Sequence, residues 1–95
     1  MMRVGVLEVR LELPGVRSLK EKRSVVKGLL ERIRHRFQVA AAEVDEMERT
    51  DRAGLGFSAV GNEVGVLQSR LQKVVSFIDT SGEGVLSDYR VEMLA

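Results

Sequence analysis

The sequence predicts an α+β domain in which two helices cover one face of a four-stranded antiparallel sheet. Three observations support this prediction: an alternating apolar pattern in residues 3–13, a long amphipathic helical pattern in residues 18–36, and a second helical pattern in residues 63–79. Shorter strand-like segments lie between the two helical patterns and after the second one. With 95 residues, 44% of them hydrophobic, the chain can bury one core without disulfides or metals, and we expect a single domain over residues 1–95.

The first predicted strand covers residues 3–13. Its apolar face consists of Leu7, Val9, Leu11 and Leu13. Charged residues such as Glu8 and Arg10 alternate with them, which indicates a strand with one buried and one exposed face. The Pro14-Gly15 dipeptide ends this strand.

The first predicted helix begins at Ser18 and extends to about Arg36. Ser18 and Glu21 have the spacing of a capping box. The apolar residues with helical spacing are Leu19, Val26, Leu29, Leu30, Ile33 and Phe37. Lys20, Lys22 and Arg23 crowd the helix start, where the partial positive charge of the backbone disfavours cations. We therefore expect an anion to bind near this turn.

The remaining elements are predicted with simpler signals. They are a strand at 37–44, a strand at 55–61, a helix at 63–79 and a strand at 85–94. Three alanines in the first of these strands would also suit a helix. The charged segment 45–54 is expected to be a loop or an irregular hairpin, and residues 80–84 a turn. Asn62 is the expected N-cap of the second helix.

The resulting order is βαββαβ, and its simplest packing is the ferredoxin-like sandwich with right-handed crossovers and strand order 4-1-3-2. Both helices then cover one face of the sheet and leave the other open. Charged residues expected on the open face are Glu8, Arg10, Glu12, Asp88, Arg90 and Glu92. An apolar section of the same face is expected from Val4, Val6, Ala40, Ala42 and Val60. Such a patch often pairs with a second subunit.

Cationic side chains are concentrated in the first helix. Residues 17–36 carry a net charge of +6, so the rest of the chain carries −5. At 100° per residue, Lys20, Arg23, Lys27 and Arg34 fall within an arc of about 60° beside the apolar stripe. The predicted anion-binding or RNA-binding residues are Lys20, Lys22, Arg23, Lys27 and Arg34. The alternative interpretation is an ordinary solvated helix face, which Glu31 interrupts.

Stacking of RNA bases on the open sheet face is not expected from the aromatic residues. Phe37 and Phe57 share the apolar phase of their predicted strands, and Phe77 lies on a helix. Only Tyr89 is a candidate for an exposed ring. Any RNA contact should therefore be to phosphates and overall shape.

Other chemistry finds little support in the sequence. The chain has no cysteine, and His35, the only histidine, lies on the polar side of its helix without a partner for catalysis. The acidic run at 43–51 lacks the spacing of a calcium loop, so a solvated loop or a contact with a basic partner is preferred over a cation such as Mg²⁺. We expect no enzymatic activity and no cofactor. No membrane span or signal peptide is apparent, and we expect a cytoplasmic protein.

Three segments resemble the YlxP-like family of small bacterial proteins of unknown function. They are S-L-K-E-K-R at 18–23, R-F-Q-V at 36–39 and A-E-V-D at 42–45. The resemblance covers essentially the whole chain and implies a ferredoxin-like fold. Genes of this family typically lie among translation and ribosome-maturation genes, which implies a role around the ribosome. Relatives often carry a tryptophan in the stretch that here reads Glu48 to Ala53, so no site is transferred onto Thr50.

Two functional hypotheses follow. In the first, the protein is a translation-associated binding protein that contacts phosphates of ribosomal RNA, free or in a ribosomal subunit, through its basic first helix. In the second, it is a homodimeric protein–protein interaction module without a role in nucleic-acid binding, which associates through the open sheet face or an edge strand. Salt-dependent RNA binding supports the first hypothesis, and self-association supports the second.

Overall fold

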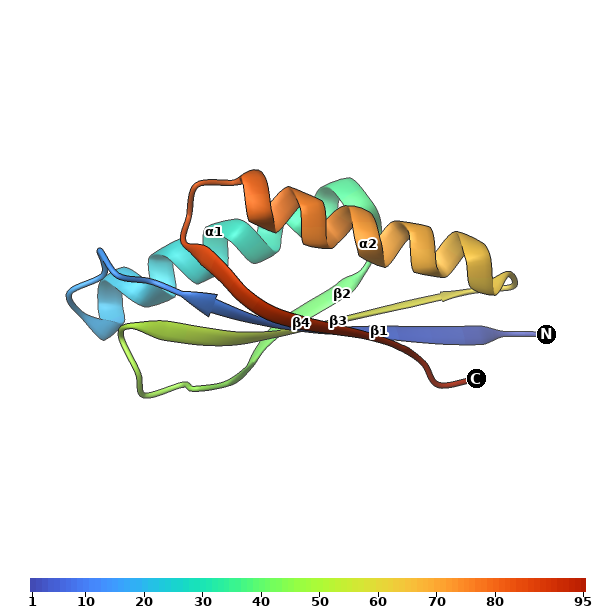
Figure 1. The fold of residues 1–95 in the computed structure, drawn as a ribbon, viewed down its shortest axis with the longest axis horizontal. Helices are drawn as coiled ribbons and strands as arrows, with labels where there is room; N and C mark the ends of the chain where they lie inside the picture. The colour runs from blue at the N-terminus through green and yellow to red at the C-terminus, as the bar shows by residue number, and fades with distance from the viewer.

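The computed structural model describes all 95 residues. The elements are β1 (Arg3–Glu12), α1 (Leu19–Phe37), β2 (Ala40–Asp45), β3 (Arg52–Gly61), α2 (Val64–Thr80) and β4 (Val85–Met93). The strands form one antiparallel sheet in the order β2-β3-β1-β4, which is the predicted order read from the other edge. Both helices lie on the same side of this sheet (Figure 1). The predicted α+β, ferredoxin-like arrangement is therefore confirmed.

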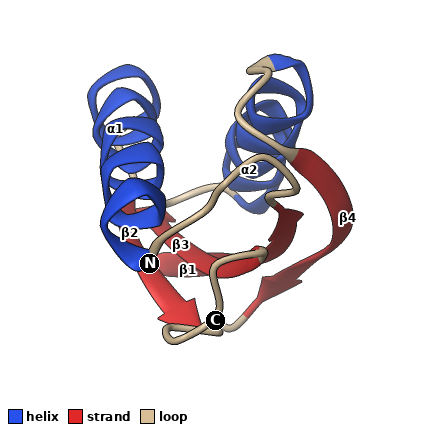
Figure 2. Ribbon diagram, turned by 90° about the vertical axis from the view of Figure 1, so that its left-hand side faces the viewer, coloured by secondary structure: helices blue, strands red, loops and turns tan.

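Strand β1 lies at the centre of the core. Its residues Leu7, Val9 and Leu11 are at most 3% exposed, because they face both helices while β3 and β4 flank them in the sheet. Leu7 pairs with Phe57 on one side and with Val91 on the other. Helix α1 stands over the β2 side of the sheet, and α2 over the side of β1 and β4 (Figure 2). The alternation in residues 3–13 thus predicted the buried face correctly.

Helix α1 begins and ends with side-chain and backbone caps. Ser18 Oγ accepts a hydrogen bond from the Glu21 N–H at 3.1 Å, as expected, but the Glu21 carboxylate accepts from Arg17 N–H rather than from Ser18. The helix continues through Phe37, and Gln38 adopts a left-handed conformation with φ 55°. The prediction that Phe37 starts a strand was therefore wrong: the strand begins only at Ala40, after this left-handed C-cap.

Two other boundaries differ from the prediction, and one strand contains an irregularity. Glu63, not Asn62, is the N-cap of α2, and it makes no side-chain capping bond. Strand β3 starts at Arg52 instead of Leu55, because Arg52 to Gly54 continue the pairing with β1. Within strand β4 the pairing with β1 is irregular at Ser87, because Asp88 pairs with Arg10 whereas Leu86 pairs with Leu11.

The open face of the sheet carries both charged and apolar residues, as predicted. Arg90 forms ion pairs with Glu8 at 3.4 Å and with Glu92 at 3.8 Å. Apolar side chains are also exposed around this face, among them Val44 and Val60, which are 57% and 59% exposed. No helix is both long enough and apolar enough to span a membrane.

Candidate nucleic-acid interface

A row of cations follows one edge of α1. We use the term cationic edge for Lys20, Arg23, Lys27 and Arg34, which are all exposed. The first three form no ion pair and no side-chain hydrogen bond within the protein. The row is about 21 Å long at a rise of 1.5 Å per residue. These four side chains are placed as the sequence predicted, and three of them are free to meet a ligand.

Arg34 fixes the position of the cationic edge relative to the sheet. Its guanidinium donates a hydrogen bond to the Ala41 carbonyl of β2 at 2.6 Å. Strand β2 is an outer strand of the sheet, so its far side has no neighbouring strand. The cationic edge therefore borders β2 on the side of α1 that faces away from α2.

Lys22 does not belong to this surface, and its prediction as an anion-binding residue was wrong. Its side chain is 1% exposed. The Nζ atom donates to the Glu46 carbonyl at 2.6 Å and lies 2.9 Å from Glu43 Oε2. Glu43 Oε2 is itself buried and forms no directed hydrogen bond, so the ion pair with Lys22 is its only compensation. Lys22 therefore pairs with a carboxylate of the protein itself, Glu43, rather than with the external anion expected near the helix start.

The position of Lys22 could have been found from helical phase. Lys22, Val26, Leu29 and Ile33 have i, i+4, i+7, i+11 spacing, so they share the core-facing stripe of α1. The charge of Lys22 suggested a surface residue instead. The lysine joins α1 to β2 and to the connection between β2 and β3, where Glu46 has a positive φ of 61°.

The acidic run at 43–51 is largely engaged within the protein. Glu43 pairs with Lys22, and Glu46 lies 3.8 Å from Arg52. The Arg49 guanidinium donates two hydrogen bonds to the Asp51 carboxylate, at 3.0 and 2.8 Å. These hydrogen bonds lower the pKa of Asp51 and raise the pKa of Arg49. No group of three or more His, Cys, Asp or Glu side chains is placed to hold a metal ion.

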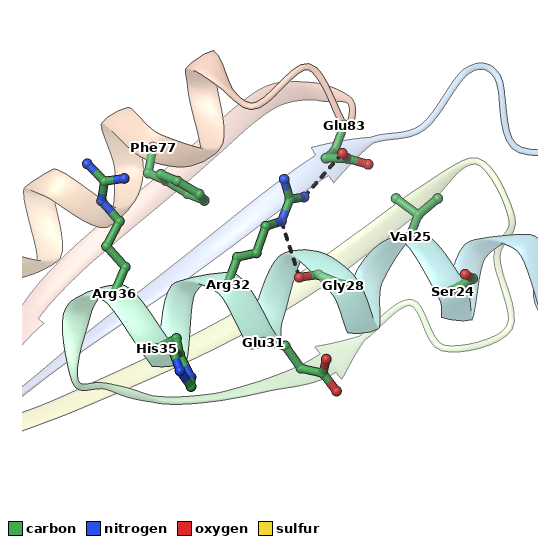
Figure 3. Close-up of a pocket in the computed structure, with 9 residues that line it drawn as sticks. All are labelled: Ser24, Val25, Gly28, Glu31, Arg32, His35, Arg36, Phe77 and Glu83. Carbon is green, nitrogen blue, oxygen red and sulfur yellow. Dashed lines mark hydrogen bonds and ion pairs between the residues drawn. The ribbon is translucent and has the colours of Figure 1, made fainter.

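A groove of about 880 Å³ separates α1 from α2 on the outer surface of the helices, and we call it the interhelical groove. Phe77 projects from α2 into it, between Arg36 and Arg32 of α1 (Figure 3). Arg32 donates to the Gly28 carbonyl at 3.3 Å and pairs with Glu83 at 3.1 Å. His35 lies on the rim, exposed. This groove was not predicted from the sequence, because it depends on the separation of two helices that are distant along the chain.

An aromatic cluster lies at one end of the groove. The rings of Phe37 and Phe77 meet edge to face, with 5.6 Å between their centroids. The Arg36 guanidinium lies 5.7 Å from the centroid of Phe37 and 5.6 Å from that of Phe77. Both distances are within the range of cation–π interactions. Tyr89, the ring expected to be exposed, is 43% exposed, and it pairs with Val9 of β1.

The fold and the site together define a small ferredoxin-like α+β protein with a row of free cations along one helix. The chain belongs to the family described as "Protein of unknown function (DUF503)", whose sequence profile matches residues 4–91. It is 32% identical over 80 residues to "Uncharacterized protein YlxP" of Bacillus subtilis (strain 168), which covers 84% of this chain and 87% of that protein. The resemblance inferred from S-L-K-E-K-R is thereby confirmed.

Two solved structures with a similar fold are designed proteins. "De novo designed protein Foldit4" matches with a TM-score of 0.59 and 12% identity, over 100% of this chain and 98% of that chain. "De novo designed protein Ferredog-Diesel" matches with a TM-score of 0.51 and 13% identity, over 94% and 83% of the two chains. At these identities the similarity shows the fold alone.

Proposed function

We propose that this protein is a non-enzymatic RNA-binding protein that contacts backbone phosphates through the cationic edge of α1. The observation that carries this proposal is that Lys20, Arg23 and Lys27 are exposed but unpaired. All three are exposed on one edge of the helix, and none has a partner in the protein. Side chains that merely balanced nearby carboxylates would be paired, as Arg32, Arg49 and Arg90 are.

The distribution of charge also supports an anionic polymer as the partner. Residues 19–37 of α1 carry a net charge of +5, whereas the rest of the chain carries −4. A polarised protein of this kind is oriented by the field of a polyanion, with its helices toward the phosphates. Ribosomal RNA, free or within a ribosomal subunit, is the first partner to test, because genes of the YlxP-like family typically lie among translation genes.

The proposal is tested by fluorescence anisotropy with a structured ribosomal RNA fragment over a series of salt concentrations. The test variant neutralises the cationic edge with the substitutions Lys20→Gln, Arg23→Gln and Lys27→Gln. The control variant has the same net charge but removes cations elsewhere, with Arg10→Gln, Arg49→Gln and Arg90→Gln. The slope of log K against log salt is negative for phosphate binding, and we expect the test variant alone to reduce its magnitude by about 2 to 3, close to one unit per lost phosphate contact. Equal effects of the two variants would contradict the proposal.

A second candidate function is a homodimeric interaction module without a role in RNA binding, and the apolar side chains around the open sheet face favour it. Val44, Val60 and Leu94 are each between 57% and 59% exposed. Burial of such side chains against a second copy contributes about 25 cal/mol per Å². Light scattering tests this candidate. A Val60→Asp substitution should shift a dimer toward monomer, and a monomer at every concentration would rule this candidate out.

A further inference from the structure

We propose that the interhelical groove receives one unpaired nucleobase of the bound RNA and stacks it against Phe77. This inference rests on the proposed function and specifies the class of RNA: a helix with a bulged or looped-out nucleotide rather than a fully paired duplex. The base would enter between α1 and α2 while phosphates of the same strand lie on the cationic edge. Recognition of single unpaired bases on aromatic side chains is the common way in which proteins read RNA.

The aromatic end of the groove supplies the stacking surface. Phe77 is only partly buried, and its ring projects between Arg36 and Arg32 (Figure 3). Phe37 packs against this ring edge to face, and Phe77 still lines the groove. Arg36 forms no ion pair or hydrogen bond, and its planar guanidinium can stack on a base as well as on a ring.

Gly28 gives the groove room on the side of α1. A glycine within a helix is less favourable than alanine, so a structural reason for it is expected. No such reason is found in the protein: a Cβ atom at Gly28 would meet no atom within 4 Å, and the residue has no positive φ. The glycine therefore leaves open space on the α1 wall of the groove, one helical turn before Arg32, where a flat group can approach the helix backbone (Figure 3).

The charges in and around the groove fit a nucleotide better than a peptide. Within the groove, Arg32 and Arg36 balance Glu31 and Glu83, which suits a neutral base. Only two of its nine lining residues, Val25 and Phe77, are hydrophobic, too few to bind an amphipathic helix. Cations for the phosphates lie on both sides. The cationic edge lies on one side, and Lys73 borders the adjacent hollow that Phe77 and Arg36 share.

The test uses two short RNA hairpins that differ by one nucleotide. One is fully paired, and the other carries a single bulged 2-aminopurine, whose fluorescence falls when it stacks. We expect the bulged hairpin to bind about 10-fold more tightly, the size of one base–aromatic stack, and its fluorescence to be quenched on binding. Phe77→Leu keeps an apolar side chain but removes the aromatic face, so it should abolish both the preference and the quenching. Tyr89→Leu removes an exposed ring away from the groove and should change neither.

A second variant fills the groove without touching its aromatic wall. Gly28→Leu places a side chain in the open space and favours the helix, so loss of the bulge preference in this variant cannot be ascribed to unfolding. Equal affinity for the two hairpins, or a bulge preference that survives both Phe77→Leu and Gly28→Leu, would overturn the inference and leave salt-dependent phosphate binding intact. Absence of binding to either hairpin at low salt would overturn the proposed function as well.

Discussion

The buried ion pair between Lys22 and Glu43 allows a sharp prediction about stability. Lys22→Met keeps the length and apolar stem of the side chain but removes its charge. Glu43, whose side chain is 13% exposed, then remains without its cation, and the Glu46 carbonyl loses a donor at 2.6 Å. Removal of one partner from a buried pair costs about 3–5 kcal/mol. Because Glu43 keeps some contact with water, we expect the lower end, about 3 kcal/mol, out of the roughly 5–14 kcal/mol typical of a domain of this size.

Urea denaturation monitored by circular dichroism measures this effect as a change in the midpoint at constant m-value. Lys22→Met combined with Glu43→Leu should recover most of the loss, because neither charge is then buried alone. Arg32→Met is the control: it breaks an ion pair whose side chains are 49% and 31% exposed, and it should cost less than about 1 kcal/mol. A Lys22→Met variant as stable as Arg32→Met, or a double variant no more stable than Lys22→Met, would refute the reasoning.

Three further predictions concern stability and titration. Gly28→Ala should stabilise the protein by about 1 kcal/mol and raise Tm by about 4–8 °C in calorimetry, because alanine favours the helix and its added Cβ would meet no atom within 4 Å. A lower Tm would contradict the open space at this position. Gly84→Ala should destabilise the protein by about 1–3 kcal/mol in urea denaturation, because the added Cβ would lie 2.5 Å from the Glu12 carbonyl oxygen. Unchanged stability would contradict this prediction. The pKa of Asp51, measured by NMR, should lie below that of an unperturbed aspartate and rise in Arg49→Gln, because Arg49 donates to the charged carboxylate. The contribution of this pair to stability is therefore present at neutral pH and is lost as the pH falls through the lowered pKa; an unchanged pKa in Arg49→Gln would disprove the assignment.

The sheet and the helices could be predicted because burial imposes a period on the sequence. From Leu7 in β1 to Leu13 just after it, every second residue is buried, and this alternation is visible without any knowledge of the partners. The order of the elements together with right-handed crossovers then leaves one simple sheet topology. Helix ends were less predictable, since they depend on single backbone conformations. Gln38 in the left-handed region delays the strand expected at Phe37 by three residues.

The candidate site could be predicted only where it depends on one helix. Lys20, Arg23, Lys27 and Arg34 share an edge because of helical geometry alone, and the structure places them as expected. Lys22 was misassigned because its partner Glu43 is brought close only by the packing of α1 on β2. The interhelical groove was missed for the same kind of reason: the approach of Phe77 to α1 is a property of tertiary structure, and no local pattern encodes it.

The location of RNA on the surface is the most direct test of the proposed function. Amide NMR spectra recorded during titration with a structured RNA report which residues sense the ligand. The proposal predicts shifts concentrated on α1 around Lys20, Arg23 and Lys27, which disappear when the salt concentration is raised. Shifts confined to the open sheet face around Val44 and Val60, or no shifts at low salt, would contradict it.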